Sequence, residues 1–293
     1  MSRALVLSGG GPVGIAWESG IAAGLASGGV DLSEADFIIG TSAGSVVGAQ
    51  IAQGTDMHAV VERYRRSAVA RGETPANPSA RGATGEQMQQ LMAAFAELFT
   101  SDAPAEQKRA KIGRVALAAQ TVPEETFLAN FRHLSDGGWP SQYRCTACDA
   151  ESGEFVVWDA DRGVDIVRAA ASSCAVPGIF PPITIGGRRY IDGGMRSASN
   201  ADLATGYDNV LVVTLFSSEP GDARMEAFRR GFESELQTLR DGGASVEVIS
   251  PDADSRAAFG VNLMDPSVSP AAAEAGLAQG AEAAARLAGS WSD

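Results

Sequence analysis

The chain has little of what marks nucleic-acid-binding proteins or membrane spans. Lysine is nearly absent: Lys108 and Lys111 are the only two among 293 residues, and the formal net charge is −13. This balance argues against nucleic acid as a partner and against simple electrostatic attraction to anionic membranes. No apolar stretch approaches the roughly 20 residues that a membrane-spanning helix needs. The strand-like run at residues 4–7 is too short for the apolar part of a signal peptide.

Cysteine is also rare. Cys145, Cys148 and Cys174 form an odd set without a secretory context, so we expect reduced thiols. Cys145 and Cys148 have C-x-x-C spacing but lie within an expected strand, whereas a redox pair opens a helix and a zinc site needs a second pair of ligands. Packing in the core is therefore favoured for both. With 45% hydrophobic residues the chain can bury a sizeable core, and its composition predicts a soluble cytoplasmic protein.

The order of apolar and glycine-rich segments predicts an α/β fold. A strand at 4–7 leads through a glycine-rich turn into a helix at 15–26, and a strand at 37–39 leads into a helix at 45–51. This alternation implies parallel strands joined by right-handed crossovers. Further along, the pattern predicts two hairpins, two strands and a terminal helix, at 143–158, 183–191, 209–216, 245–249 and from Ser269 onward.

Small residues predict close packing in two helices. Gly20 and Gly24 are four residues apart, so they share a helix face and would let the first helix approach the sheet closely. The alanine-rich terminal helix at 271–288 is likewise expected to pack against the sheet.

Length and pattern favour a single domain over residues 1–293, with a largely helical insertion or cap at about 56–135. Within that region, residues 87–99 place methionine, leucine and phenylalanine at helical spacing. Packing of this stripe in the core is favoured over a role as a lid or a lipid-facing surface, because such stripes usually bury themselves in their own domain.

The most informative motif is Gly40-Thr41-Ser42-Ala43-Gly44, which lies between an expected strand and an expected helix. G-x-S-x-G in that position is the nucleophile elbow, a turn so tight that its flanking residues must be glycine. The turn holds the serine hydroxyl outward at a helix N-terminus, where the partial positive charge favours a developing alkoxide. The motif therefore makes Ser42 a candidate nucleophile.

A second glycine-rich turn, residues 9–14, satisfies G-x-G-x-x-G and raises the alternative of a Rossmann-like nucleotide-binding protein. That fingerprint requires an acidic residue at the end of the second strand, and here the strand ends in Gly40. Amides exposed at a helix start serve equally well as an oxyanion hole. Two such turns at neighbouring strand ends favour acyl transfer over nucleotide binding.

The base that would activate Ser42 is less obvious. The two histidines, His58 and His133, are more typical of solvent-facing or packing positions, and none follows in the last 160 residues, where an α/β-hydrolase would place one. A carboxylate becomes the better candidate. Of three Asp-Gly-Gly triplets, those at Asp136 and Asp241 resemble ordinary turns. Asp192 ends a strand, and the ends of strands in parallel sheets are where ligands sit.

These motifs together resemble the patatin-like phospholipase family, as does the run from Ala170 to Pro182. The resemblance covers about residues 4–215 and fits the middle helical section least. It implies a three-layer α/β/α sandwich with a mostly parallel central sheet, and an acyl hydrolase that acts on lipid esters through a Ser–Asp dyad, as a phospholipase A or lysophospholipase does. It implies no metal or nucleotide cofactor and leaves room for transient contact with a membrane or micelle surface. By position it assigns the nucleophile to Ser42, the general base to Asp192, the oxyanion hole to Gly9, Gly10 and Gly11, and motif glycines to Gly14, Gly40, Gly44, Gly193 and Gly194.

One departure from the family pattern concerns the glycine-rich turn. The family often carries Arg or Lys just before its last glycine, where this chain has Val13, and the neighbouring Pro12 lacks an amide donor. Losing one oxyanion donor costs on the order of 100-fold in rate. A slower enzyme, a preference for neutral esters, or a weakly active acyl-binding protein are therefore the alternatives within the family.

Overall fold

A computed structural model describes residues 1–70, 93, 102–215, 223–260 and 262–291. Apart from residue 93, the amphipathic stripe expected at 87–99 lies outside the described residues, and so does the end of the strand expected at 209–216.

The described strands form one mixed sheet with the order β5-β6-β3-β2-β1-β7-β8, and β4 pairs with β3 beside this path. β3, β2, β1, β7 and β8 are parallel to one another, as the alternating pattern predicted. β4, β5 and β6 come from the two predicted hairpins and run antiparallel. The strands are β1 (Arg3–Leu7), β2 (Phe37–Gly40), β3 (Tyr143–Asp149), β4 (Phe155–Trp158), β5 (Ile183–Ile185), β6 (Arg188–Asp192), β7 (Asn209–Val213) and β8 (Ser245–Ile249).

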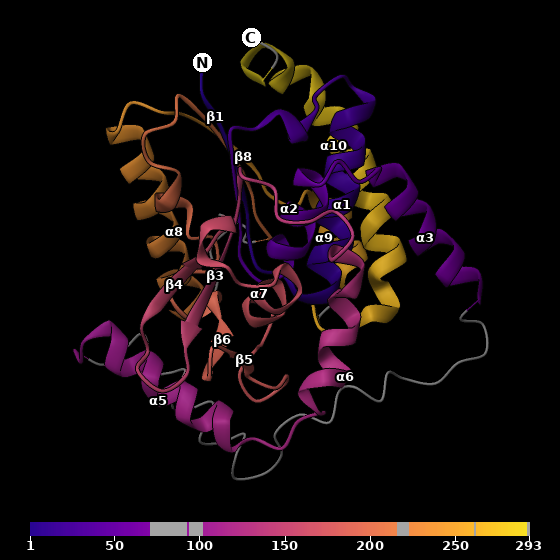
Figure 1. Cartoon of the computed structure of the whole chain (residues 1–293). Helices are drawn as coiled ribbons and strands as arrows, with labels where there is room; N and C mark the ends of the chain where they lie inside the picture. The colour runs from indigo at the N-terminus through magenta and orange to yellow at the C-terminus, as the bar shows by residue number, and fades with distance from the viewer. Residues whose placement is uncertain (71–92, 94–101, 216–222, 261, 292–293) are drawn as a thin grey trace.

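Helices cover both faces of the sheet, which confirms the three-layer α/β/α prediction (Figure 1). Alternate side chains of β1 explain the layers, because successive residues of a strand point to opposite faces. Leu5 and Leu7 belong to the larger core, shared with α1 and α10, whereas Ala4 and Val6 belong to a second core under α8. The helices are α1 (Gly11–Ser27), α2 (Ala43–Ala52), α3 (Met57–Ala70), α5 (Ala105–Ala118), α6 (Glu124–Leu128), α7 (Ile166–Ser173), α8 (Ala223–Asp241), α9 (Ala253–Phe259) and α10 (Ser269–Trp291), with short 3-10 turns that include η3 (Ala129–Leu134) and η5 (Gly193–Met195).

The terminal helix packs mainly on other helices. α10 lies along α1, α3 and α9, and its C-terminal end reaches the sheet, where Arg286 pairs with Glu247 of β8 and Arg3 of β1 donates to the Trp291 carbonyl. A methyl group on Gly20 or Gly24 would overlap backbone atoms of α10, and one on Gly276 would overlap the backbone of α1. The small residues thus bring two helices together rather than a helix and the sheet.

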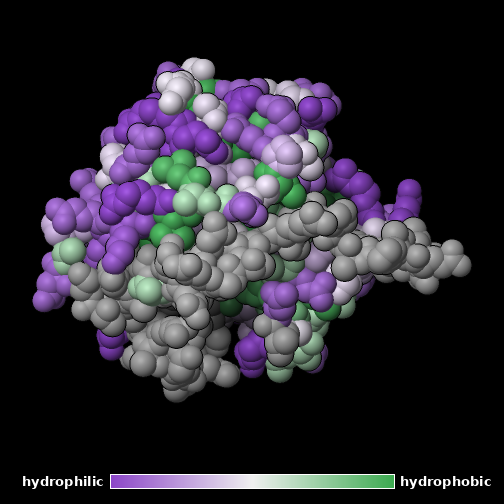
Figure 2. Space-filling view, turned by 90° about the horizontal axis from the view of Figure 1, so that it is seen from below, coloured by the Kyte–Doolittle hydropathy of each residue, from purple (hydrophilic) through white to green (hydrophobic). Residues whose placement is uncertain are grey.

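The helical region at 56–135 attaches at separate places. α3 contacts α1 and α10, whereas α5 contacts β3 and β6 on another part of the molecule. Figure 2 views the molecule from below and shows hydrophobic residues grouped among hydrophilic ones on that face.

Candidate active site

Ser42 lies in the turn between β2 and α2 with φ 52° and ψ −117°. Residues other than glycine rarely adopt a positive φ, and such backbone strain persists only where the surrounding structure enforces it. The flanking glycines explain how the turn fits: a methyl group on Gly40 would overlap the carbonyl of Gly44, and one on Gly44 would overlap the carbonyl of Leu7 in β1. The motif therefore adopts the expected elbow, and the Ser42 side chain is only 7% exposed.

Three side chains hold this strained turn. The Ser42 amide donates to the hydroxyl of Ser173, 2.9 Å away at the end of α7. Its carbonyl accepts from the Ser45 hydroxyl at 2.6 Å and from the Cys174 thiol at 3.1 Å. Sequence reasoning did not assign these roles to Ser173 and Cys174, although both lie in the 170–182 run that carries part of the family resemblance.

Strand register brings Asp192 to the elbow. Gly40 of β2 is level with Cys145 of β3, and Ala147, two residues further along β3, is level with Asp192 at the end of β6. Ser42 is also two residues beyond Gly40, so Ser42 and Asp192 reach the same height of the sheet on either side of β3. The prediction placed Asp192 at the end of a strand in a parallel sheet, but β6 is antiparallel and reaches this height from the opposite direction.

The Asp192 carboxyl is 3% exposed, and burial raises its pKa from 3.8 to about 7. The Gly194 amide donates to Oδ1 at 2.7 Å and opposes this rise by stabilising the ionised form, as the nearby Ser42 hydroxyl also does. The neighbouring Gly193 packs so closely on Thr146 of β3 that a methyl group there would overlap its side chain.

Polar contacts tie the strands together beneath these two residues. The hydroxyls of Thr41 and Thr146 are 2.9 Å apart, which links the elbow to β3. The Asn200 amide donates to the Thr41 hydroxyl at 3.0 Å and to the Ser197 carbonyl at 2.7 Å. Each of these buried side chains has a hydrogen-bond partner. Together they fix the elbow relative to β3 and to the segment at residues 197–200.

The glycine-rich turn between β1 and α1 faces Ser42. A methyl group placed on Gly9 would lie 3.4 Å from the Ser42 Cβ, so Gly9 lies directly beside the candidate nucleophile. Its amide donates to the Ala198 carbonyl at 2.8 Å. This corrects the expectation that Gly9, Gly10 and Gly11 all offer free amides. The amides of Gly10 and Gly11 donate to no acceptor within the described part of the chain.

Neither histidine is hydrogen-bonded to the candidate dyad. His58 on α3 is 3.1 Å from the Ser27 hydroxyl, and His133 lies in η3. Asp136 lies in a turn and Asp241 is the last residue of α8, directly before a turn, and Gly138 and Gly243 after them have positive φ.

The comparison with protein families decides the identity of the fold. The sequence matches the family described as Patatin-like phospholipase over residues 5–205. The chain belongs to this family. It has no significant match among curated proteins.

Solved structures that match the chain include bacterial proteins. VipD from Legionella pneumophila is 15% identical with a TM-score of 0.45, and the match covers 97% of this chain and 67% of VipD. The type III effector ExoU is 19% identical with a TM-score of 0.43, with 97% of this chain and 53% of ExoU covered. A chain of the ExoU–SpcU complex from the type III secretion system of Pseudomonas aeruginosa is 16% identical with a TM-score of 0.30. That match covers 99% of this chain and 60% of the other. The chain thus spans about half to two thirds of their length.

The departure of this family member in its glycine-rich turn is visible in the structure. Val13 is fully buried in the core, and its amide donates to the Leu263 carbonyl at 3.3 Å. Pro12 follows Gly11 at the first turn of α1 and has no amide hydrogen. Position 13 therefore presents no cation to the space above Ser42.

A buried carboxyl that sequence reasoning missed lies behind the site. Glu18 of α1 is fully buried, and neither of its carboxyl oxygens has a hydrogen-bond partner within 3.5 Å among the described residues. Burial raises its pKa well above 4.5, although the nearby Ser8 backbone lowers it. The charge of this carboxyl also raises the pKa of the Cys174 thiol, which is already raised by burial and by Asp192.

The two strand cysteines are packed as expected. Cys145 and Cys148 are buried free thiols on β3 and contribute to different core clusters. Burial raises the pKa of each to about 12. Within the described residues, no three His, Cys, Asp or Glu side chains gather as metal ligands would. Nor does any helix there combine the length and apolar character needed to cross a bilayer.

Proposed function

We propose that the chain is a serine acyl hydrolase that cleaves lipid acyl esters, with Ser42 as nucleophile and Asp192 as general base. The observation that carries the proposal is that Ser42 lies beside the buried carboxyl of Asp192, whose pKa is raised by burial to about 7. A general base works best when its pKa is near the operating pH. Membership of the patatin-like phospholipase family supports an ester of a lipid as substrate.

The proposed reaction has two steps. Asp192 accepts the hydroxyl proton as the Ser42 oxygen attacks the ester carbonyl, and the resulting oxyanion is held by the amides of Gly10 and Gly11. Collapse of this intermediate expels the alcohol, which takes the proton from Asp192, and leaves the acyl group on Ser42. Water then gives a proton to Asp192 and attacks the acyl-enzyme, which releases the fatty acid and restores the serine.

The elbow lowers the cost of forming the alkoxide. Ser42 directly precedes α2, so the partial positive charge of the helix N-terminus lies beside its oxygen. The hydrogen bonds to Ser173 and Cys174 hold the backbone, so that no rearrangement is needed when the proton leaves. Fewer than three amides of the glycine-rich turn are free to stabilise the oxyanion. This supports a lower rate than that of an enzyme in which all three amides donate to it.

Labelling with a fluorophosphonate probe, alongside hydrolysis of p-nitrophenyl esters of graded chain length, tests this proposal. The wild type should be labelled and active, Ser42→Ala should lose both properties, and Asp192→Asn should lose most of its turnover. An unlabelled and inactive wild type would contradict the proposal. Thermal stabilisation by a dinucleotide would then favour the nucleotide-binding alternative, and stabilisation by acyl compounds the weakly active acyl-binding one.

The finer assignments belong to the same proposal. We propose one domain over residues 1–293 in which part of the helical region at 56–135 covers the site. The split between phospholipase A and lysophospholipase activity follows from comparing diacyl and monoacyl phospholipids as substrates of the wild-type protein, with Ser42→Ala as the blank.

A further inference from the structure

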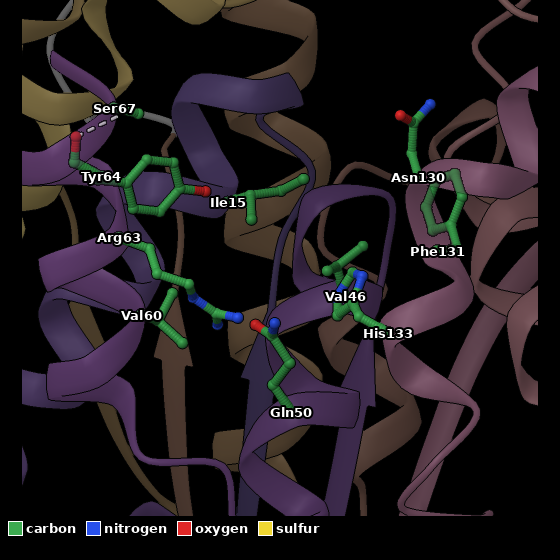
Figure 3. Close-up of a pocket in the computed structure, with 10 residues that line it drawn as sticks. All are labelled: Ile15, Val46, Gln50, Val60, Arg63, Tyr64, Ser67, Asn130, Phe131 and His133. Atoms are coloured by element: carbon green, nitrogen blue, oxygen red, sulfur yellow. Dashed lines mark hydrogen bonds between the residues drawn. The ribbon is translucent and has the colours of Figure 1, made fainter. Parts of the chain in front are cut away.

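A separate pocket of about 400 Å³ lies among α1, α2, α3 and η3. Its volume is within the range of small-molecule sites in proteins, roughly 300–1,000 Å³. None of the residues that line it belongs to the elbow, to the glycine-rich turn or to the segment around Asp192. Figure 3 shows the lining residues Ile15, Val46, Gln50, Val60, Arg63, Tyr64, Ser67, Asn130, Phe131 and His133.

The pocket is built from an apolar wall and a polar mouth. Val46, Val60 and Phe131 are buried core residues whose sides form the wall, and Ile15 packs against the same core. Binding of an alkyl chain along this wall is favourable by about 25 cal/mol for each Å² of apolar surface removed from water.

Charge at the mouth is positive in a protein that is strongly negative. No Asp or Glu is among the lining residues, although the chain has 36 acidic residues. Arg63 forms no ion pair with any residue that the structure describes, whereas its neighbours on α3 do: Arg65 pairs with Glu274 and Arg66 with Glu62. An unpaired guanidinium beside an apolar wall is suited to bind a carboxylate or phosphate.

A buried amide points into the same space. Gln50 of α2 is 5% exposed, and its Oε1 atom has no hydrogen-bond partner among the described residues. Figure 3 shows the Gln50 amide and the Arg63 guanidinium facing each other across the pocket. The nitrogen of the same amide carries two N–H donors, which can donate to an anionic headgroup held by Arg63.

We propose that this pocket is a second ligand site, separate from Ser42, that binds a single-chain amphiphile with an anionic headgroup. The headgroup accepts hydrogen bonds from the Arg63 guanidinium and the Gln50 amide nitrogen, and the alkyl chain lies along Val46, Val60 and Phe131. Carboxylate and phosphate monoester headgroups share this chemistry. Binding does not require that Ser42 be a nucleophile, so the proposal is tested in the Ser42→Ala variant, where hydrolysis cannot interfere.

The chain provides a direct spectroscopic readout, because it has only two histidines. His133 lines the pocket, and its pKa is lowered by desolvation and further by Arg63. His58 lies outside the pocket and contacts Ser27. In proton NMR titrations of Ser42→Ala with decanoate, decyl phosphate and decanol, the two anions should shift the His133 ring signal saturably and leave that of His58 in place. The tighter of the two anions identifies the headgroup, and decanol should bind at least tenfold more weakly.

Variants of α3 locate the charge. Arg63→Gln should weaken binding of the anions about tenfold or more, and Arg63→Lys should keep most of the affinity. Arg66→Gln makes the same charge change on the same helix and should leave affinity unchanged. A photoreactive diazirine fatty acid should label peptides of α3 and η3. Three results would overturn the proposal. They are equal affinity for the anions with and without Arg63→Gln, an unmoved His133 signal, and labelling confined to the segments around residues 9–14 and 192–200.

Discussion

The amide of Ser42 donates to the hydroxyl of Ser173, 131 residues later in the chain and 2.9 Å away. This bond holds the backbone of the nucleophile elbow at its positive φ. Ser173→Ala leaves a buried amide without an acceptor, at a cost of about 1–3 kcal/mol, and lets the turn relax. We expect a lower Tm and a fall in kcat/KM for a p-nitrophenyl ester of about tenfold, because small displacements of a nucleophile are costly.

Ser172→Ala is the matched control for that change. The Ser172 hydroxyl accepts from the Trp158 indole at 3.1 Å and donates to the Ala169 carbonyl at 2.7 Å, and it does not touch the elbow. Its loss should lower Tm while kcat/KM per folded molecule stays near the wild-type value. Equal losses of activity in the two variants would mean that Ser173 acts only on stability.

The rate should depend on pH through Asp192. Burial raises the pKa of this carboxyl to about 7, and only the ionised form can accept the Ser42 proton. We expect kcat/KM to rise with pH, with an apparent pKa near 7, and to level off above it. Initial rates between pH 5 and 9 with a neutral ester measure this profile. A flat profile over that range would exclude Asp192 as the base.

The same carboxyl should make the folded protein less stable as pH rises. The folded state holds a proton on Asp192 up to about pH 7, whereas the unfolded chain gives it up near pH 3.8. Stability from this group is therefore full below pH 3.8, declines between the two values and is lowest above pH 7. The difference corresponds to at most roughly 4 kcal/mol.

Asp192→Asn should accordingly be more stable than the wild type at pH 8 and equally stable at pH 4. The asparagine keeps an oxygen for the Gly194 amide and carries no charge. Urea unfolding at both pH values measures the difference. A variant that is less stable at pH 8 would show that Asp192 is not a strained, buried base.

The elbow glycines should tolerate no side chain. A methyl group on Gly44 would overlap the backbone carbonyl of Leu7 in β1, which cannot move without breaking the sheet. Gly44→Ala should lose at least about 3 kcal/mol of stability or fail to fold. Gly289→Ala on α10 is the control, because nothing lies within 4 Å of the added methyl. It should be neutral or stabilising by up to about 1 kcal/mol, as measured by urea unfolding.

Much of the local structure could be predicted from sequence. The turns at Gly40–Gly44, at 151–153 and at Gly186-Gly187 were recognisable because few residue types allow their backbone angles. The alternation of strands and helices likewise predicted the parallel part of the sheet. These features depend on neighbours along the chain, so a single sequence contains the information.

The tertiary structure decided the hydrogen-bond partners and the burial of the site residues. In the folded chain the Gly9 amide donates to Ala198 and the Ser42 amide donates to Ser173, and most of α10 packs on α1 and its neighbouring helices. It also buried Asp192, which sets its pKa. Hydrogen-bond partners and burial depend on residues far away in the chain that meet only after folding, whereas the elbow, the glycine-rich turn and Asp192 with its two glycines could be recognised from the sequence alone.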